Sequence, residues 1–388
     1  MAESKIWAEA QELNEQLVTW RRYLHQIPEL GINLPQTTAY VAEQLTKLGV
    51  DHEVFEDVSC IVATIGKGDR CILLRGDMDG LPGEEQSGEE FSSTNGCMHA
   101  CGHDIHPSAL LGAAKILKAH EDELNGVVKL LFQSGEEVFK GSEAAIKAGV
   151  LENPKVDAAY GMHVFAQPEI GEVQFGDIIM GAVFGFKITV TGVGGHGSQP
   201  ENCIDPINAA VAIYQAFQSL IARELPSYEE GVLTIGQFQA GQAANAIPDK
   251  AVLQGTLRTF KPAIKEMMMR RIREVAESVG QTYRCTVEVE TLSNVPSVMC
   301  DAELTETFLG SIRKLGIMHK ETPGLHLIGS EDFANISAQV PSTYFIIGGG
   351  MDNPEERLAQ HNPKIRFNEK CLPMGAAIYA QIALDFLK

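Results

Sequence analysis

The chain has 388 residues, of which 44% are hydrophobic and 21% charged, an ordinary globular composition with enough apolar material for two domains. Its 51 acidic residues outnumber its 31 basic residues and give a net charge of -20, so the chain would repel a phosphate backbone and we expect no nucleic acid partner. No segment approaches the roughly 18 consecutive apolar residues of a membrane span, so we expect no membrane association.

The N-terminal residues predict a polar amphipathic helix rather than a signal peptide. Helical patterning runs from about Ile6 to Leu48 and is broken near Pro28 and Gly31. The eight cysteines are scattered, without the regular spacing of a small disulfide-rich secreted domain. We therefore expect reduced thiols and a cytoplasmic protein.

Short apolar runs then alternate with helical stretches. Strands are expected at 61–65, 72–75, 127–133 and 158–164, and helices at 107–119 and 142–149. This alternation predicts an α/β domain with a largely parallel central sheet. In such sheets ligands gather at the carboxyl ends of the strands, which is where the notable polar residues of this chain fall.

The pattern changes near residue 181. A half-exposed strand at 184–190 is followed by a helix at 205–223, strands at 231–238 and 251–260, a helix at 262–280 and a strand at 284–290. The order β-α-β-β-α-β predicts a ferredoxin-like domain. We therefore expect residues 1–180 and 292–388 to form the two parts of a larger α/β catalytic domain, with 181–291 inserted between them. The second part should end in a helix at 373–387.

The densest polar cluster is the segment MHACGHDIH, which places a thiol, three imidazoles and a carboxylate just before a helix. Imidazole and thiolate are good ligands for zinc and related ions. Cys101 and His103 are separated only by a glycine, so both side chains can turn toward one point. The segment therefore predicts a functional metal site.

The same segment has simpler interpretations. His99 and His106 could be polar residues flanking the helix, Asp104 its N-cap, and Cys97 with Cys101 half of a structural zinc site. A structural site would need a second close pair of ligands elsewhere, and the sequence has no Cys-x-x-Cys pair. The functional site is the better supported interpretation.

Two carboxylates, Glu136 and Glu137, directly follow an apolar strand. Consecutive residues point in different directions, so one carboxylate can bind a metal while the other faces a water molecule and moves its proton. In isolation such a pair is more often a solvated acidic turn. Its place at a strand end favours a catalytic role.

Three further signals are weak when taken singly. His163 lies at the end of a predicted strand, His361 lies in a loop, and Asp77 and Asp79 follow another strand. Together with the preceding segments they bring imidazole, carboxylate and thiolate groups to the ends of several strands. That combination is typical of sites that hold two metal ions.

The motifs RGDMDGLP, MHACGHDIHPSALLGAA, FQSGEEV, YGMHV, GGHGSQP, NAIPD, GTLRT, GSEDF and HNPKIRF occur in this order between residues 75 and 367. With them the chain resembles the aminoacylase-like metallopeptidases, which include hippurate hydrolase, N-acetyl amino acid deacetylases and plant indole-acetyl amino acid hydrolases. The resemblance implies metal-dependent hydrolysis of N-acyl (acetyl, benzoyl or similar) L-amino acids to a carboxylate and a free amino acid. It also implies that the inserted domain is a dimerisation or lid domain.

By this resemblance two divalent metal ions are bound in each subunit, and Cys101 bridges them. The implied ligands are Cys101, His103, Glu137, His163 and His361. Zinc, manganese, cobalt and nickel all fit, because the thiolate favours softer ions and the carboxylate harder ones. The resemblance makes Glu136 the general base and places Asp79 behind a histidine ligand, which it would orient.

The resemblance also implies substrate-binding residues on the inserted domain. His196 would reach the active site of a partner subunit and polarise the scissile carbonyl, and Asn245 and Arg258 would hold the free carboxylate of the substrate. The resemblance therefore also implies a homodimer or a homotetramer. The simpler interpretations are that His196 is a loop histidine between glycines and that Arg258 is a solvated arginine on a strand.

Three other functions stay open. A dipeptidase or aminopeptidase of the same superfamily would need an acidic pocket for a free amine, which is not evident in the sequence. A structural zinc protein would use Cys97 and Cys101 as scaffold ligands. A thiol redox protein would use the same two cysteines, but the surrounding histidines argue against it.

Overall fold

The computed structural model describes residues 4–388 and divides them into two compact units. Unit 1 contains the described part of Met1–Ile179 together with Val298–Leu325 and Asp332–Lys388. Unit 2 contains Met180–Ser297 and the short segment His326–Glu331.

The segment His326–Glu331 differs from the sequence-based division, which assigned it to the second part of the larger domain. It belongs to unit 2 because Gly181 donates its backbone N–H to Leu327 O (2.9 Å) and Gly329 O (2.8 Å). The ring of His326 also stacks on Phe260, with 3.4 Å between ring centroids. These contacts involve backbone and ring faces, which the sequence pattern does not reveal.

The N-terminal part of unit 1 is helical. It forms α1 (Lys5–Glu12), α2 (Asn14–His25) and α3 (Pro35–Lys47). A gap between α2 and α3 falls where Pro28 and Gly31 interrupt the pattern, and a further break occurs at Leu13.

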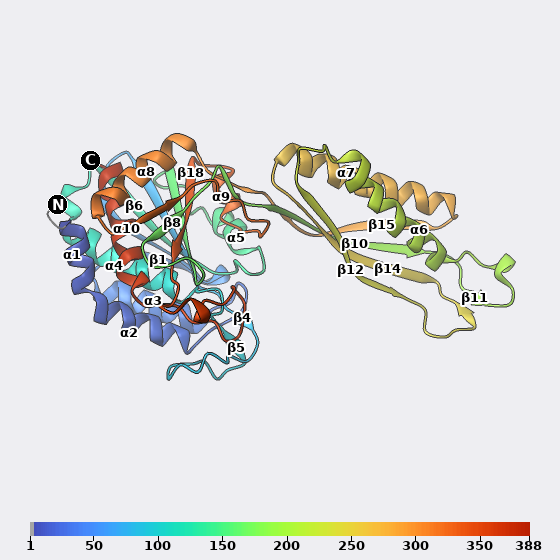
Figure 1. Ribbon diagram of the computed structural model, residues 1–388, viewed down its shortest axis with the longest axis horizontal. Helices are drawn as coiled ribbons and strands as arrows, with labels where there is room; N and C mark the ends of the chain where they lie inside the picture. The colour runs from blue at the N-terminus through green and yellow to red at the C-terminus, as the bar shows by residue number, and fades with distance from the viewer. Residues whose placement is uncertain (1–3) are drawn as a thin grey trace. The chain divides into compact units, whose positions relative to one another are not determined.

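An eight-stranded sheet forms the centre of unit 1, in the order β1-β2-β6-β3-β7-β18-β8-β17 (Figure 1). Its strands are β1 (Asp51–Phe55), β2 (Cys60–Lys67), β3 (Cys71–Asp77), β6 (Gly126–Gln133), β7 (Ala158–Phe165), β8 (Glu172–Gln174), β17 (Lys320–Thr322) and β18 (Ser342–Gly348). The central strands β6, β3, β7 and β18 are parallel and almost completely buried. The pairs β1–β2, β2–β6 and β18–β8 are antiparallel, so the sheet is mixed, with a parallel centre.

Helices and short strands complete unit 1. They are α4 (Ile105–Ala119), α5 (Gly141–Lys147), α8 (Ala302–Leu315), α9 (Ala334–Ser337), α10 (Cys371–Phe386), β4 (Leu81–Pro82), β5 (Cys97–Met98), β9 (Ile178–Met180) and β16 (Val298–Met299). Helices α4 and α10 are buried along most of their length and pack closely through small residues. A Cβ at Gly112 would lie 2.9 Å from Ala376 Cβ, and one at Gly375 would lie 3.0 Å from Ala109 Cβ.

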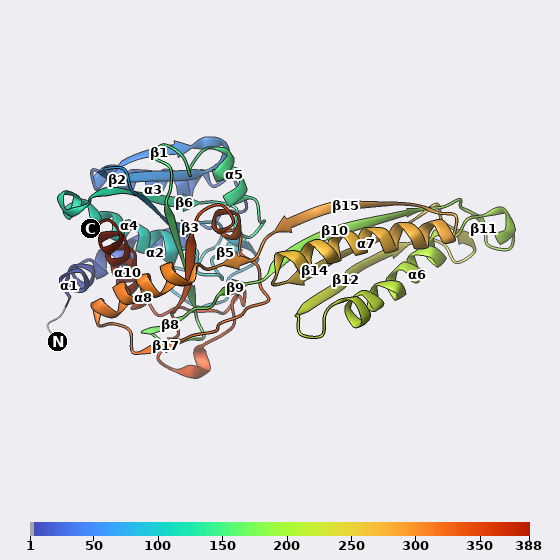
Figure 2. The ribbon, with the colours of Figure 1, turned by 90° about the horizontal axis from the view of Figure 1, so that it is seen from above.

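Unit 2 has the predicted element order. It consists of β10 (Ala182–Thr191), α6 (Pro206–Ser219), β12 (Gly231–Ala240), β14 (Lys250–Thr259), α7 (Pro262–Thr282) and β15 (Thr286–Val295). The four strands form an antiparallel sheet in the order β12-β14-β10-β15, and both helices lie on the same face of it (Figure 2). This is the ferredoxin-like arrangement. The last strand starts later than expected because the chain is still turning at Arg284, whose φ is 65°. It continues to Val295, so unit 2 extends to Ser297 rather than ending at residue 291.

A second, smaller pairing extends one end of unit 2. β11 (Gly195–His196) pairs with β13 (Ala246–Ile247), beyond the end of the sheet where Thr191 pairs with Lys250. We call this pair of two-residue strands, together with the turn residue Asn245 that directly precedes β13, the β11–β13 ribbon.

Among residues 4–388 no helix combines the length and the apolar character needed to cross a membrane.

Candidate metal centre

The predicted metal ligands all lie in unit 1, and all except the loop residue His361 lie close to strand ends. Glu136 and Glu137 follow β6, His163 lies near the end of β7, and Cys101 and His103 lie between β5 and α4. Because β6, β3 and β7 are parallel, their carboxyl ends meet at one edge of the sheet.

The ligand atoms of these residues converge in three overlapping groups, within each of which all atoms lie within 4.8 Å of one another. The groups are Cys101–His103–His163, Cys101–Glu137–His361 and His103–Glu136–Glu137. Cys101 Sγ lies 3.4 Å from His163 Nε2, and His361 Nε2 lies 3.5 Å from Glu137 Oε1. The thiol of Cys101 is thus shared between two three-residue groups.

Two backbone conformations in the left-handed region bring these ligands together. Gly102 has φ +92°, and a Cβ there would lie 2.6 Å from Val164 Cγ1, so only glycine fits between Cys101 and His103. His361 has φ 69°, and its N–H donates to Ala100 O at 2.9 Å. A histidine held in this conformation indicates local strain at a functional position.

The donor set fits metal ions. His103 Nε2 and Glu137 Oε1 are buried and have no hydrogen-bond partner among residues 4–388. The Nδ1 atom of His103 lies 3.0 Å from the carbonyl oxygen of Asp79, which leaves Nε2 as the lone-pair atom. Buried polar atoms without a partner are unfavourable, and a bound cation would satisfy both.

The electrostatics of the cluster also favour a cation. Burial, aided by Asp79, raises the pKa of Glu137 to about 7. Burial also raises the pKa of the Cys101 thiol, although His103 opposes the shift. Burial and the neighbouring imidazoles hold the pKa of His163 well below its ordinary value. A bound divalent cation would bring both the carboxyl and the thiol to their anionic, ligating forms.

The carboxylate of Asp79 holds the turn that carries the two glutamates. Its oxygens accept the backbone N–H groups of Glu136 and Glu137, both at 3.0 Å. The expected contact with a histidine is made mainly by its backbone, since His103 Nδ1 lies 3.0 Å from the Asp79 carbonyl oxygen and 3.6 Å from its carboxylate. Asp79 therefore fixes both the glutamate turn and one imidazole.

The structure favours a functional site over the simpler interpretations of the segment before α4. Asp104 stands at the N-cap position but makes no cap hydrogen bond, because its carboxylate accepts from Arg21 Nε and contacts His25 Nδ1, both at 2.7 Å. His99 and His106 are buried rather than exposed beside the helix. Cys97 belongs to none of the candidate ligand groups found within residues 4–388.

Several buried residues around the centre were not assigned from the sequence. Arg75 donates to Asp77 Oδ2 at 2.6 Å and to Asp332 Oδ1 at 3.1 Å, and all three side chains are 0% exposed. His106 and Gln360 contact the backbone of the ligand segments, as described below. An arginine inside an otherwise apolar strand was the one signal in the sequence that pointed to this network.

The predicted substrate residues all lie in unit 2, in two separate places. His196 and Asn245 are exposed and adjacent on the β11–β13 ribbon, where Gly197 N–H donates to Asn245 O at 2.9 Å. Arg258 lies near the opposite end of β14, paired with Val183 and Val232. The ribbon and Arg258 thus mark opposite ends of the sheet.

Arg258 is partly buried and donates only to neutral acceptors in the part of the chain that is described. Its Nη1 lies 3.3 Å from Ile328 O and 3.2 Å from Ser330 Oγ. Burial lowers its pKa. Because these acceptors are neutral, the charge of the Arg258 guanidinium can still attract an anionic ligand.

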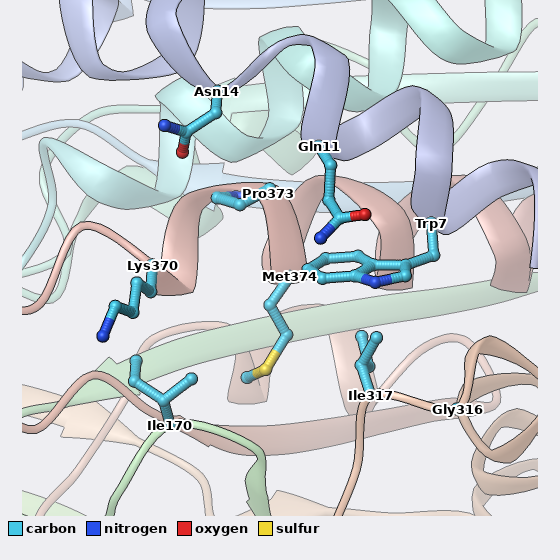
Figure 3. Close-up of a pocket in the computed structure, with 9 residues that line it drawn as sticks. All are labelled: Trp7, Gln11, Asn14, Ile170, Gly316, Ile317, Lys370, Pro373 and Met374. Carbon is cyan, nitrogen blue, oxygen red and sulfur yellow. The ribbon is translucent and has the colours of Figure 1, made fainter. Parts of the chain in front are cut away.

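A separate pocket of about 540 Å³ lies between α1, α10 and the loop at residues 316–317 (Figure 3). Trp7 and Met374 contribute its apolar surface. Its one charged side chain, Lys370, is paired with Asp352 at 3.1 Å. None of the predicted catalytic or ligating residues lines it, so this pocket is not the reactive site.

An α/β unit with thiolate, imidazole and carboxylate ligands at the ends of parallel strands, joined to a ferredoxin-like unit, is the architecture of a metal-dependent hydrolase. Sequence comparison gives the family. The profile of peptidase family M20/M25/M40 matches residues 73–385, and the chain belongs to this family.

Relatives cover nearly the whole chain. IAA-amino acid hydrolase ILR1-like 4 of Arabidopsis thaliana is 35% identical over 379 residues, covering 96% of this chain and 86% of its own. Thermostable carboxypeptidase 1 of Saccharolobus solfataricus is 33% identical and covers 98% of both chains. N-acetylcysteine deacetylase of Bacillus subtilis is 32% identical and covers 96% of this chain and 97% of its own.

Solved structures agree with the fold. A protein of methicillin resistant Staphylococcus aureus assigned as an aminohydrolase matches with TM-score 0.93 and 31% identity over 99% of both chains. The YXEP protein of Bacillus subtilis, a dinuclear metal binding peptidase from the M20 family, matches with TM-score 0.83 and 29% identity over 97% of this chain and 99% of its own.

Proposed function

We propose that this protein hydrolyses the amide bond of N-acyl L-amino acids at a site that holds two divalent metal ions. The observation that carries the proposal is the thiol of Cys101, which belongs to two separate three-residue ligand groups. Relatives named for hydrolysis of IAA-amino acids and for deacetylation of N-acetylcysteine support the substrate class. The YXEP protein, a dinuclear metal binding peptidase, supports the two-ion site.

In this proposal Cys101, His103 and His163 would hold one ion, and Cys101, Glu137 and His361 would hold the other. Zinc, manganese, cobalt and nickel all suit this mixed set. When bound, the ions would lower the pKa of a water molecule and polarise the amide carbonyl.

Glu136 acts as the general base. Its backbone is fixed by the carboxylate of Asp79 at 3.0 Å, and its side chain is 6% exposed, so it is pre-positioned and shielded from bulk water. It takes a proton from the attacking water and returns it to the leaving amine. A carboxylic acid and a free amino acid are released.

The α-carboxylate of the substrate is held by Arg258 and Asn245. The guanidinium of Arg258 has only neutral acceptors among the described residues, and a carboxylate would replace these with a charge-assisted, two-point contact. Asn245, exposed on the β11–β13 ribbon, offers an amide donor.

The separation of these residues supports a homodimer. Lys250 and Arg258 are eight positions apart on β14, which is about 26 Å along an extended strand. His196 and Asn245 lie beyond Lys250, so one chain cannot bring them and Arg258 to one small substrate. The ribbon of a partner subunit would complete the site, in a homodimer or in a homotetramer built from such dimers.

The hydrogen bonding of His196 suits a donor to the carbonyl oxygen. Its Nδ1 accepts the backbone N–H of Ser198 at 3.2 Å and lies 2.8 Å from Ser198 Oγ. In the neutral ring the proton then resides on Nε2, which points a hydrogen-bond donor at an incoming oxyanion.

The test is a panel of substrates combined with metal analysis of the purified protein. We expect about two ions per chain and faster hydrolysis of N-acetyl and N-benzoyl amino acids than of dipeptides. A preference for dipeptides or longer peptides would favour the alternative of a dipeptidase, aminopeptidase or carboxypeptidase, the last being the name of a relative. One tightly held ion without hydrolysis would instead indicate a structural zinc protein. The cytoplasmic location stays a prediction.

A further inference from the structure

Two polar side chains next to the proposed metal ligands have no part in the proposed reaction. His106 is 0% exposed and is the second residue of α4. Gln360 is partly buried and directly precedes His361. Both side chains hydrogen-bond to the backbone of other ligand segments, and the ring of His106 also packs against that of His163, with 4.6 Å between ring centroids.

The backbone of Val164 is the point where they meet. Its N–H donates to His106 Nε2 at 2.9 Å. Its carbonyl oxygen accepts from Gln360 Nε2 at 3.1 Å and lies 2.8 Å from His163 Nδ1. His163 is the preceding residue, so holding the N–H and the C=O of Val164 holds the backbone and ring of a ligand. The ring is thereby turned with Nε2 toward Cys101 Sγ, at 3.4 Å.

His106 is itself held in one tautomer. Because its Nε2 accepts the Val164 N–H, its proton resides on Nδ1, which donates to Asp77 Oδ1. The other oxygen of Asp77 is bound by Arg75 at 2.6 Å. The buried pair of Asp77 and Arg75 therefore keeps the His106 acceptor pointed at the Val164 peptide.

Gln360 joins three ligand segments. Its Nε2 donates to Cys101 O at 2.9 Å as well as to Val164 O, and its Oε1 accepts from Ala166 N at 3.2 Å. The next residue is His361, whose backbone conformation is left-handed. One amide side chain thus links the segments of Cys101, His163 and His361.

We propose that His106 and Gln360 are positioning residues that set the affinity of the site for metal ions by holding the Val164 peptide and, through Gln360, the backbone of Cys101. This inference rests on the proposed function for the identity of the ligands. His106 holds backbone of the Cys101–His103–His163 group alone, whereas Gln360 holds backbone of the ligand groups of both ions. Partners of this kind, which orient ligands without touching the ion, typically change metal affinity by about 10- to 100-fold.

For His106 the test compares two substitutions of similar size. In His106→Gln the amide can still accept the Val164 N–H and donate to Asp77, whereas His106→Met can do neither. We expect His106→Met to weaken the binding of one Mn²⁺ or Zn²⁺ ion about 10- to 100-fold in competition with a chelator, and His106→Gln to restore it. His120→Gln and His120→Met are matched controls, since His120 is also buried and bound to carboxylates, Glu9 and Glu123, away from the centre.

For Gln360 the variant is Gln360→Met, which removes both donors while keeping the length of the side chain. We expect this variant to bind each of the two metal ions more weakly. At saturating metal its kcat should return toward that of the wild type, because Gln360 touches neither substrate nor ion. Gln44→Met is the matched control: Gln44 accepts from Trp20 Nε1 at 3.1 Å, and its loss should alter stability but not metal affinity.

The outcomes separate this inference from the proposed function. Wild-type protein that binds fewer than two ions would contradict the two-ion site itself. Wild-type protein that binds two ions, with His106→Met and Gln360→Met binding them as tightly as their controls, would overturn the positioning roles alone. If His106→Met does not fold, Gln360→Met decides.

Discussion

The two units present their functional residues in opposite ways. In unit 1 the side chains of the candidate centre are mostly buried, and each is fixed by contacts from other segments, as the Asp79 carboxylate fixes the Glu136 and Glu137 backbone at 3.0 Å. In unit 2, His196 is exposed on a strand of two residues, and Asn245 is exposed in the turn directly before another such strand. Under the proposed function, the reacting groups are built in advance within one chain, whereas the substrate-binding groups would be completed by another.

The difference follows from the two sheets. The central strands of unit 1 are buried and parallel, so polar residues are placed where these strands end, inside the protein. The β11–β13 ribbon lies beyond the last pair of a small antiparallel sheet, with no third strand beside it among the described residues. Each prediction below tests one side of this contrast.

The largest effect is expected for Glu136→Gln. Without the base, kcat should fall by about 10²- to 10⁴-fold while metal content stays at that of the wild type, because Glu136 is not one of the five proposed metal ligands. Turnover and metal analysis on the same preparation measure this. Glu143→Gln, an exposed carboxylate paired with Lys147 on α5, is the matched control. Near-normal turnover of the metal-loaded variant would refute the base assignment.

His196→Ala should lower kcat by about 10²- to 10³-fold, the usual loss when one oxyanion donor is removed. Metal affinity should not change, since the residue lies in unit 2. If His196 acts across subunits, mixing this variant with Glu136→Gln should recover about a quarter of the wild-type rate, because each heterodimer has one intact site. Heterodimers that form but stay inactive would show that the histidine works within its own chain.

Arg258→Met should raise KM for N-acyl amino acids about 10- to 100-fold through loss of a charge-assisted contact. Substrates whose α-carboxylate is replaced by an amide should be hydrolysed equally well by variant and wild type. Lys187→Met removes another cation of the same sheet, paired with Glu290 at 3.2 Å, and should leave KM unchanged. An equal loss on both kinds of substrate would assign Arg258 a structural role.

The smallest effect is expected for Ser198→Ala. It removes the hydroxyl 2.8 Å from His196 Nδ1 but keeps the backbone N–H at 3.2 Å, so kcat should fall only about two- to tenfold. Measured in a His196→Ala background, the same substitution should have no further effect. If Ser198→Ala lowered kcat just as much in that background, Ser198 would not act through His196.

Much of the fold could be predicted because local patterns encode it. The apolar runs that became β6 and β7, and the alternation that became β10, were found within a few residues of their ends. The direction of the outer strands could not be predicted, since apolar patterning is the same for strands of either direction. The placement of His326–Glu331 in unit 2 also depends on backbone contacts that leave no pattern.

In the candidate centre, the side chains proposed to bind the metal ions could be predicted from the sequence. Those that act on the backbone of a ligand could not. Cys101, His103 and the glutamates stand in dense, recognisable motifs, and the structure brings them together. The role of His106 depends on the N–H of Val164, a backbone group that every residue except proline carries. The assignment of their catalytic and substrate-binding roles remains a prediction that the variants above test.

The buried charge on Arg75 constrains the order in which the chain can fold. Its partner Asp332 lies 257 positions later, and β18, which occupies the middle of the large sheet, is later still. During synthesis from the N-terminus, unit 2 would have its contiguous stretch Met180–Ser297 complete before either arrives. The inserted unit can thus mature first, while the sheet of the catalytic unit and its Arg75–Asp332 contact can be completed only after the final third of that unit has been synthesised.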